Sequence, residues 1–137
     1  ALREGGARSV MAAYTETDGV PASADPALLT GLLREEWGFT GTVVSDYFGV
    51  GFLRSLHRVA GTPAQAARLA LAAGVDVELP TVSCYGSPLL EAVRAGEVPE
   101  ALIERSARRV LLQKCELGLL DEDWTPEPPA GDGPVDL

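Results

Sequence analysis

The residues best suited to chemistry in this chain follow a short apolar run. Thr42, Val43 and Val44 lead directly into Ser45, Asp46 and Tyr47. β-branched residues that end in a polar triplet are typical of a buried parallel strand. In α/β folds, ligands bind and catalytic side chains project at the C-terminal ends of such strands. We therefore predict that Asp46 is a catalytic carboxylate, and the alternative is that it caps the following turn.

The elements that would position this carboxylate alternate along the chain. Asp25 and Pro26 have the pattern of a helix start, and Gly38 and Gly74 are expected to end helices. After Tyr47 the chain is expected to turn through its next glycines. Strands are predicted at 9–14, 42–45 and 75–79, a loop at 15–21, and helices at 26–37, 64–73, 88–95 and 99–117. This alternation predicts an α/β fold with a parallel sheet and right-handed crossovers.

The predicted sheet is too small to be complete. Three parallel strands would leave two edges unpaired and one face poorly covered. A closed (β/α)₈ barrel needs about 250 residues, whereas this chain has 137. We therefore expect the chain to be a fragment of a larger protein, with the rest of the sheet supplied by another chain or a further segment. Residues 122–137 lose periodicity and are rich in proline, which predicts a linker.

Composition excludes several classes of partner. The net charge is −9 and 46% of the residues are hydrophobic, which is typical of a globular protein that binds neither nucleic acid nor an anionic membrane. No apolar stretch approaches the ~20 residues of a membrane span, and no signal peptide is recognisable. Cys84 and Cys115 have no zinc spacing and set no disulfide framework. Free thiols are expected, which favours the cytoplasm over secretion.

An ordered series of motifs resembles glycoside hydrolase family 3. The similarity covers about residues 8–121 and is closest to the β-glucosidase/β-xylosidase branch, through Ser45-Asp46-Tyr47-Phe48 and Cys84-Tyr85-Gly86. The other segments that carry it are 9–14, 18–21, 28–34, 37–39, 73–80 and 105–119. The resemblance implies that residues 1–121 form the last three β/α units of the family's N-terminal TIM-type barrel. Residues 122–137 would then lead to a missing second domain.

The resemblance also implies an activity. The parent protein would be an exo-acting retaining β-glycosidase that hydrolyses terminal β-D-glucosyl or β-D-xylosyl residues, with Asp46 as the nucleophile. Retaining enzymes need a second carboxylate as acid/base, and no segment here resembles the region that supplies it. The chain alone is therefore expected to be inactive. Its expected partners are a small carbohydrate substrate and the remaining segments of the same enzyme, without a cofactor or a metal.

Five further residues are candidates for substrate binding. Tyr14 matches a family tyrosine near the nucleophile, and Tyr47 could form an apolar wall against the sugar; both could instead be ordinary structural aromatics. Met11 matches a residue near the sugar pocket, although a strand methionine is more often core. Glu78 is expected to point to the same barrel face, or else to serve a structural salt bridge. His57, in the loop region after the Asp46 strand, could touch the aglycone.

Two other interpretations remain open at this stage. The polypeptide could be a catalytically inert fragment or an interaction module. It could also belong to a β-N-acetylhexosaminidase of the same family, although that branch normally places an Asp-His pair in a barrel loop and none is found here. The sequence contains no Gly-rich phosphate loop and no cluster with convincing metal spacing.

Overall fold

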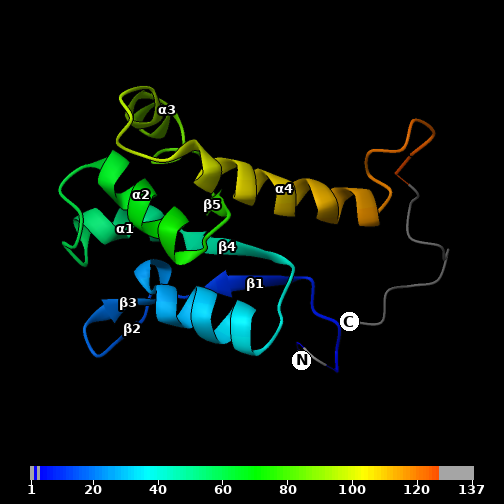
Figure 1. Cartoon of the computed structure of the whole chain (residues 1–137), viewed down its shortest axis with the longest axis horizontal. Helices are drawn as coiled ribbons and strands as arrows, with labels where there is room; N and C mark the ends of the chain where they lie inside the picture. The colour runs from blue at the N-terminus through cyan, green and yellow to red at the C-terminus, as the bar shows by residue number, and fades with distance from the viewer. Residues whose placement is uncertain (1, 3, 127–137) are drawn as a thin grey trace, which may run out of the picture.

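The fold is a three-stranded parallel sheet with helices packed on one of its faces (Figure 1). This is a computed structural model, and it describes residues 2 and 4–126. The central strand, β4 (Thr42–Tyr47), lies between β1 (Ser9–Ala12) and β5 (Val77–Leu79). Both pairings are parallel. The predicted α/β architecture is therefore confirmed, and the closure of this sheet into a barrel stays a prediction.

Side chains cap the first turns of two helices. Asp25 Oδ1 accepts hydrogen bonds from the N–H groups of Ala27 (2.9 Å) and Leu28 (3.1 Å). Thr62 Oγ1 accepts one from the N–H of Gln65 at 3.1 Å. These side chains satisfy N–H groups that a helix start leaves free. The helical elements are η1 (Ala22–Ala24), η2 (Ala27–Glu36), α1 (Gly49–Ser55), α2 (Pro63–Ala73), α3 (Ser87–Arg94) and α4 (Glu100–Glu116).

Three local expectations are corrected. The segment 15–21, predicted as a loop, contains an antiparallel hairpin of β2 (Glu16–Thr17) and β3 (Val20–Pro21). The second strand continues through Asp46 to Tyr47. The residues after it form helix α1 where a glycine turn was expected. Val50 and Leu53 of α1 are fully buried, and this packing outweighs the low helix propensity of the glycines beside them.

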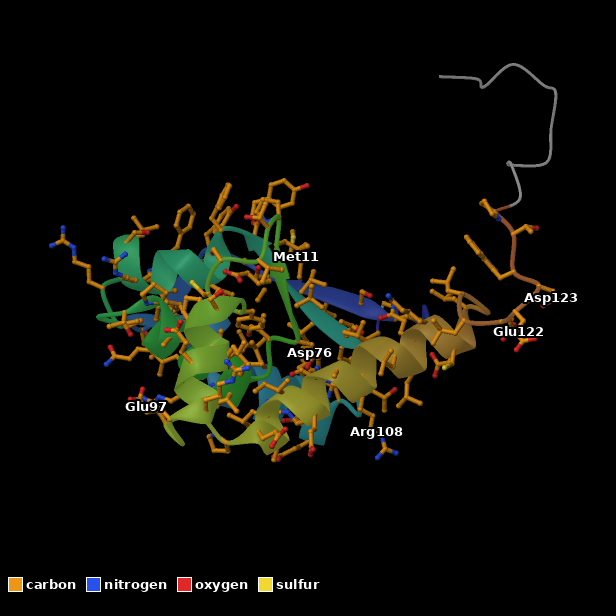
Figure 2. The ribbon with its side chains drawn as sticks, turned by 90° about the horizontal axis from the view of Figure 1, so that it is seen from above. Met11, Asp76, Glu97, Arg108, Glu122 and Asp123 are labelled. Carbon is orange, nitrogen blue, oxygen red and sulfur yellow. The ribbon has the colours of Figure 1, made fainter. Side chains whose placement is uncertain are left out.

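The core lies between the sheet and the helices. Along β1 and β4, the buried side chains of Ala12, Val43 and Ser45 face the helix layer. Met11 alternates with them and is 56% exposed, because the opposite face of the sheet has no helix against it. Figure 2 shows Met11 and Asp76 on opposite sides of the strands, with Asp76 towards α4. The sheet therefore has a covered face and an open face.

A buried ionic cluster joins the helices to the sheet. Asp76 precedes β5, and its carboxylate has no exposed area. Oδ2 accepts hydrogen bonds from Arg34 of η2 (2.8 Å) and from the N–H of Val43 (2.9 Å), and Oδ1 accepts one from Arg109 of α4 (2.9 Å). Arg105 of α4 also donates to the carbonyl of Leu71. One carboxylate thus fixes η2 and α4 against β4.

The last helix extends beyond the sheet (Figure 1). Leu102 and Ile103 of α4 pack against the core, but Leu111 and Leu112 farther along the same helix are about half exposed. Polar contacts nevertheless tie the second half of α4 to the first strand, because Gln113 Nε2 donates to Ser9 Oγ at 2.9 Å and Glu116 pairs with Arg8. The predicted linker at 122–137 lies mostly outside the described residues. Among the described helices, none is long and apolar enough to cross a membrane.

Candidate functional site

The C-terminal end of β4 contains a register irregularity. Val44 pairs with Val77 and Tyr47 pairs with Leu79, so β4 advances three residues while β5 advances two. Leu79 secures both sides of this bulge, because its N–H donates to Ser45 Oγ (3.0 Å) and its carbonyl accepts from the N–H of Phe48 (2.7 Å). Bulges of this kind re-aim side chains at functional sites. Here Ser45 is buried on the covered face, whereas Asp46 is partly exposed.

The structure brings Tyr14 and Asp46 together, as the sequence predicts. The Tyr14 hydroxyl donates to the carbonyl oxygen of Tyr47 at 2.7 Å, and the Tyr47 N–H donates to Asp46 Oδ1 at 2.7 Å. Desolvation, a hydrogen bond to the Asp46 carboxylate and its negative charge together raise the pKa of Tyr14 above its usual 10.0. The hydroxyl therefore stays protonated at neutral pH and remains a donor beside the carboxylate.

Aromatic side chains extend away from this pair. The ring centroids of Tyr14 and Phe52 lie 5.3 Å apart, and those of Phe52 and Phe48 lie 6.4 Å apart, both in tilted arrangements. Tyr47 is 57% exposed and Phe48 is 54% exposed. Sequence reasoning missed Phe48 and Phe52. Phe48 directly precedes α1 and Phe52 lies within it, so their contact depends on a helix that the sequence did not predict.

Glu78 does not join this group, which corrects the expectation that it points to the same face. It is buried, and its carboxylate accepts hydrogen bonds from the N–H groups of Ser83, Cys84 and Tyr85 and from the Ser83 hydroxyl, all at 2.8–2.9 Å. Burial would raise the pKa of Glu78, but these hydrogen bonds outweigh it and hold the pKa below 4.5. Glu78 anchors the segment 83–85.

Met11 and His57 occupy different surroundings. Met11 lies on the open face of the sheet, as a residue near a ligand on that face would. The imidazole of His57 is only 10% exposed, and its Nδ1 lies 3.4 Å from Glu16 Oε2 of β2. His57 thus connects the segment after α1 to the β2–β3 hairpin, and little of its ring is available to a ligand.

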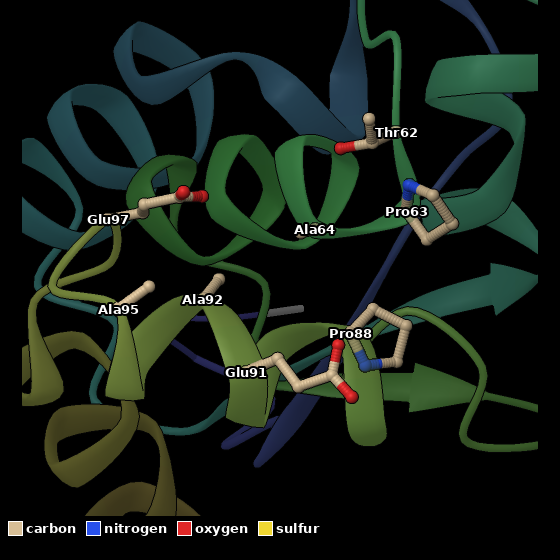
Figure 3. Close-up of a pocket in the computed structure, with 8 residues that line it drawn as sticks. All are labelled: Thr62, Pro63, Ala64, Pro88, Glu91, Ala92, Ala95 and Glu97. Atoms are coloured by element: carbon tan, nitrogen blue, oxygen red, sulfur yellow. The ribbon is translucent and has the colours of Figure 1, made fainter.

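Two clefts lie away from Asp46. A groove of about 400 Å³ between α2 and α3 is lined by Thr62, Pro63, Ala64, Pro88, Glu91, Ala92, Ala95 and Glu97 (Figure 3). A cleft of about 260 Å³ runs along β1 and η2, and its lining is mostly apolar, including Val10, Met11, Leu28 and Leu32. The second cleft lies at the unpaired edge of the sheet, where a further strand and helix would fit.

The remaining candidates for chemistry are metal-binding groups and the two cysteine thiols. Within residues 2 and 4–126, no group of three His, Cys, Asp or Glu side chains could hold a metal ion. Cys84 and Cys115 are free thiols, as predicted. Burial, followed by the charge of Glu78, raises the pKa of Cys84 to about 11. Cys115 is exposed on α4.

Comparison with known proteins gives a consistent picture. The model of the glycosyl hydrolase family 3 N-terminal domain matches residues 1–112. Beta-D-xylosidase 3 of Arabidopsis thaliana is 34% identical over 98% of this chain, which spans 17% of that protein. A solved β-glucosidase from Erythrobacter marinus is 46% identical with a TM-score of 0.84, over 88% of this chain and 16% of that one. A β-glucosidase from Listeria innocua in complex with glucose is 35% identical with a TM-score of 0.80, over 85% and 16%. The chain thus spans about a sixth of the length of these proteins.

Proposed function

The chain belongs to glycosyl hydrolase family 3, and from this membership we propose that it is part of an exo-acting retaining β-glycosidase. Its substrates are β-glycosides with a terminal β-D-glucosyl or β-D-xylosyl residue, since its relatives are named for both sugars. The observation that carries the proposal is the position of Asp46, a partly exposed carboxylate at the bulged C-terminal end of the central parallel strand.

Residues 1–121 form the last three β/α units of the parent's barrel in this proposal. Both edges of the described sheet and its open face support it, because a barrel would pair those edges and enclose that face. The apolar cleft of about 260 Å³ along β1 is the place of the preceding unit. Residues 122–137 then connect the barrel to a second domain, as the sequence predicts.

Asp46 acts as the nucleophile in this mechanism. It attacks the anomeric carbon, a covalent glycosyl-enzyme forms, and water then hydrolyses it. The hydrogen bond from the Tyr47 N–H holds Oδ1 and so orients the carboxylate, while Oδ2 can face the sugar. Tyr14 donates its hydroxyl hydrogen to the Tyr47 carbonyl oxygen and so fixes the backbone beside Asp46. Met11 and Tyr47, both exposed, supply apolar surface for the sugar.

The acid/base must come from elsewhere in the parent enzyme. Retaining enzymes place two carboxyl groups about 5–5.5 Å apart. Glu78 cannot supply the second one, because its oxygens are bound to the segment 83–85 on the covered side of the sheet. In this proposal Asp46 is one half of the catalytic pair, and the rest of the parent enzyme supplies the other half.

Asp46→Asn in the full-length enzyme that carries this chain tests the assignment. We expect kcat for an aryl β-glucoside or β-xyloside to fall about 10³- to 10⁵-fold, because the substituted amide cannot form the glycosyl-enzyme. A 2-fluoro glycoside should label the wild-type enzyme on the peptide that contains Asp46. The 137-residue chain alone should show no turnover in the same assay.

Asp18→Asn is the matched control. Asp18 lies in the turn of the β2–β3 hairpin with φ = 51°, a conformation that asparagine also tolerates. This variant should retain kcat within about twofold, which a general effect of removing one negative charge would not allow. Covalent labelling at another carboxylate, or near-normal turnover of Asp46→Asn, would show that Asp46 is not the nucleophile.

A further inference from the structure

Phe48 has an unusual backbone conformation for its type. Its φ is 63° and its ψ is 7°, in the left-handed region. Bulky residues rarely occupy this region, because the Cβ atom crowds the backbone there. The ring nevertheless stays half exposed, so burial in the core does not explain its presence. Strained residues of this kind cluster at active sites and ligand-binding sites.

The backbone holds Phe48 close to Asp46. Only Tyr47 separates them in the sequence, so their Cα atoms lie at most about 7 Å apart. The N–H of Phe48 donates to the carbonyl of Leu79 at 2.7 Å, which fixes its position against β5. Phe48 is also the residue from which α1 starts. The left-handed turn thus places an aromatic ring at the edge of the site in a defined position.

The ring of Phe48 is the last of three aromatic rings that follow one another from the backbone beside Asp46. The Tyr14 hydroxyl donates to the carbonyl oxygen of Tyr47, Phe52 lies beside Tyr14, and Phe48 lies beside Phe52. We call Tyr14, Phe52 and Phe48 the aromatic row. The successive ring centroids lie 5.3 and 6.4 Å apart. Its members carry no charge at neutral pH.

We propose that the outer part of the aromatic row, Phe48 with Phe52, binds the aglycone and gives the enzyme a preference for β-glycosides of aromatic alcohols. This proposal rests on the proposed function above. Asp46 would attack from one face of the sugar while the aglycone lies on the other, so a surface that contacts the aglycone must extend past the sugar. Phe48 and Phe52 would provide such a surface next to the Asp46 segment, and aromatic faces favour flat apolar rings in offset or edge-to-face contact.

The test compares two substrates that differ in one ring. Benzyl and methyl β-glycosides both release alcohols of similar acidity, so the ratio of their kcat/KM values reports contact with the aromatic ring. The sugar is glucose or xylose, whichever the full-length wild-type enzyme hydrolyses faster. Phe48→Gly removes the ring and suits the left-handed backbone, so the variant should fold with an unchanged or higher Tm.

We expect Phe48→Gly to lower the benzyl-to-methyl ratio about 3- to 10-fold, as the loss of one aromatic contact would. Phe52→Leu, which keeps apolar volume but removes the second ring, should lower the ratio in the same direction. Leu56→Ala is the control, since Leu56 is an exposed apolar residue just after α1 and outside the row. It should leave the ratio unchanged.

The outcomes separate this proposal from the one it rests on. If the wild-type enzyme hydrolyses both substrates and Asp46→Asn is inactive, but Phe48→Gly keeps the wild-type ratio, the aromatic row does not bind the aglycone. Equal losses on both substrates in Phe48→Gly would also overturn the proposal, because the ring would then act on the nucleophile or the sugar. If Asp46→Asn retains near-normal turnover, the proposed function itself fails.

Discussion

Asp76→Asn should destabilise the 137-residue chain strongly. The Asp76 carboxylate is fully buried and accepts hydrogen bonds from Arg34, Arg109 and the N–H of Val43. Asparagine has a similar shape but no charge, and its amide can accept through one atom only. The substitution leaves two guanidinium groups facing a neutral side chain, with 8% and 21% of the Arg34 and Arg109 side chains exposed.

The size of the effect follows from this geometry. Removing one partner of a buried ion pair costs about 3–5 kcal/mol, because an uncompensated charge stays behind. The partial exposure of Arg109 lets water relieve some of that cost, so we expect a loss of about 3 kcal/mol in the free energy of unfolding. Whole domains have only about 5–15 kcal/mol. With an m-value of about 2 kcal/mol per M in urea, the unfolding midpoint should fall by about 1.5 M.

Urea unfolding followed by far-UV circular dichroism measures this loss. Glu116→Gln is the matched control, because it removes one carboxylate charge from the surface pair of Arg8 and Glu116, whose side chains are about half exposed. Such pairs contribute about 0–1 kcal/mol. If Asp76→Asn is too unstable to measure, Arg109→Lys keeps the charge but loses the planar fork, and should cost about 1–2 kcal/mol. Equal losses for the buried and the surface variants would refute the reasoning.

Two further outcomes concern the segment 78–85. The pKa of Glu78 lies below 4.5 in the folded state, so the stabilising effect of its carboxylate is complete above pH 4.5 and is lost as the pH falls through the folded pKa. The difference in the free energy of unfolding between wild type and Glu78→Gln should therefore shrink on acidification below pH 4.5. A difference that does not change with pH would contradict this. The raised pKa of about 11 and the burial of Cys84 predict that a thiol reagent at pH 8 modifies only Cys115 in the folded chain and both cysteines in urea; rapid modification of Cys84 without denaturant would contradict it.

The sequence predicted the elements whose signals are local. Asp25 and Thr62 cap helices within three residues of themselves, and the apolar run before Ser45 needs only its own composition to indicate a buried strand. The position of Asp46 at the end of that strand followed from the same run. The motif resemblance supplied the neighbourhood of Tyr14, which no local pattern contains.

The features that escaped prediction depend on distant parts of the chain. Helix α1 forms despite its glycines because Val50 and Leu53 meet the core, which only the assembled fold provides. The face to which Glu78 points depends on the register between β4 and β5, and a bulge changes that register within a few residues. The contact of Arg34 with Asp76 joins residues 42 apart in sequence. A single sequence contains no signal for such a pairing.

The equal spacing of the strand pairs has a consequence for synthesis. Ser9 pairs with Thr42 and Val44 pairs with Val77, so each strand meets its partner 33 residues later in the chain. At about 5–20 residues per second, a ribosome takes roughly 2–7 s to supply that partner. During this interval the apolar strand that has already emerged is exposed to chaperones and to other nascent chains.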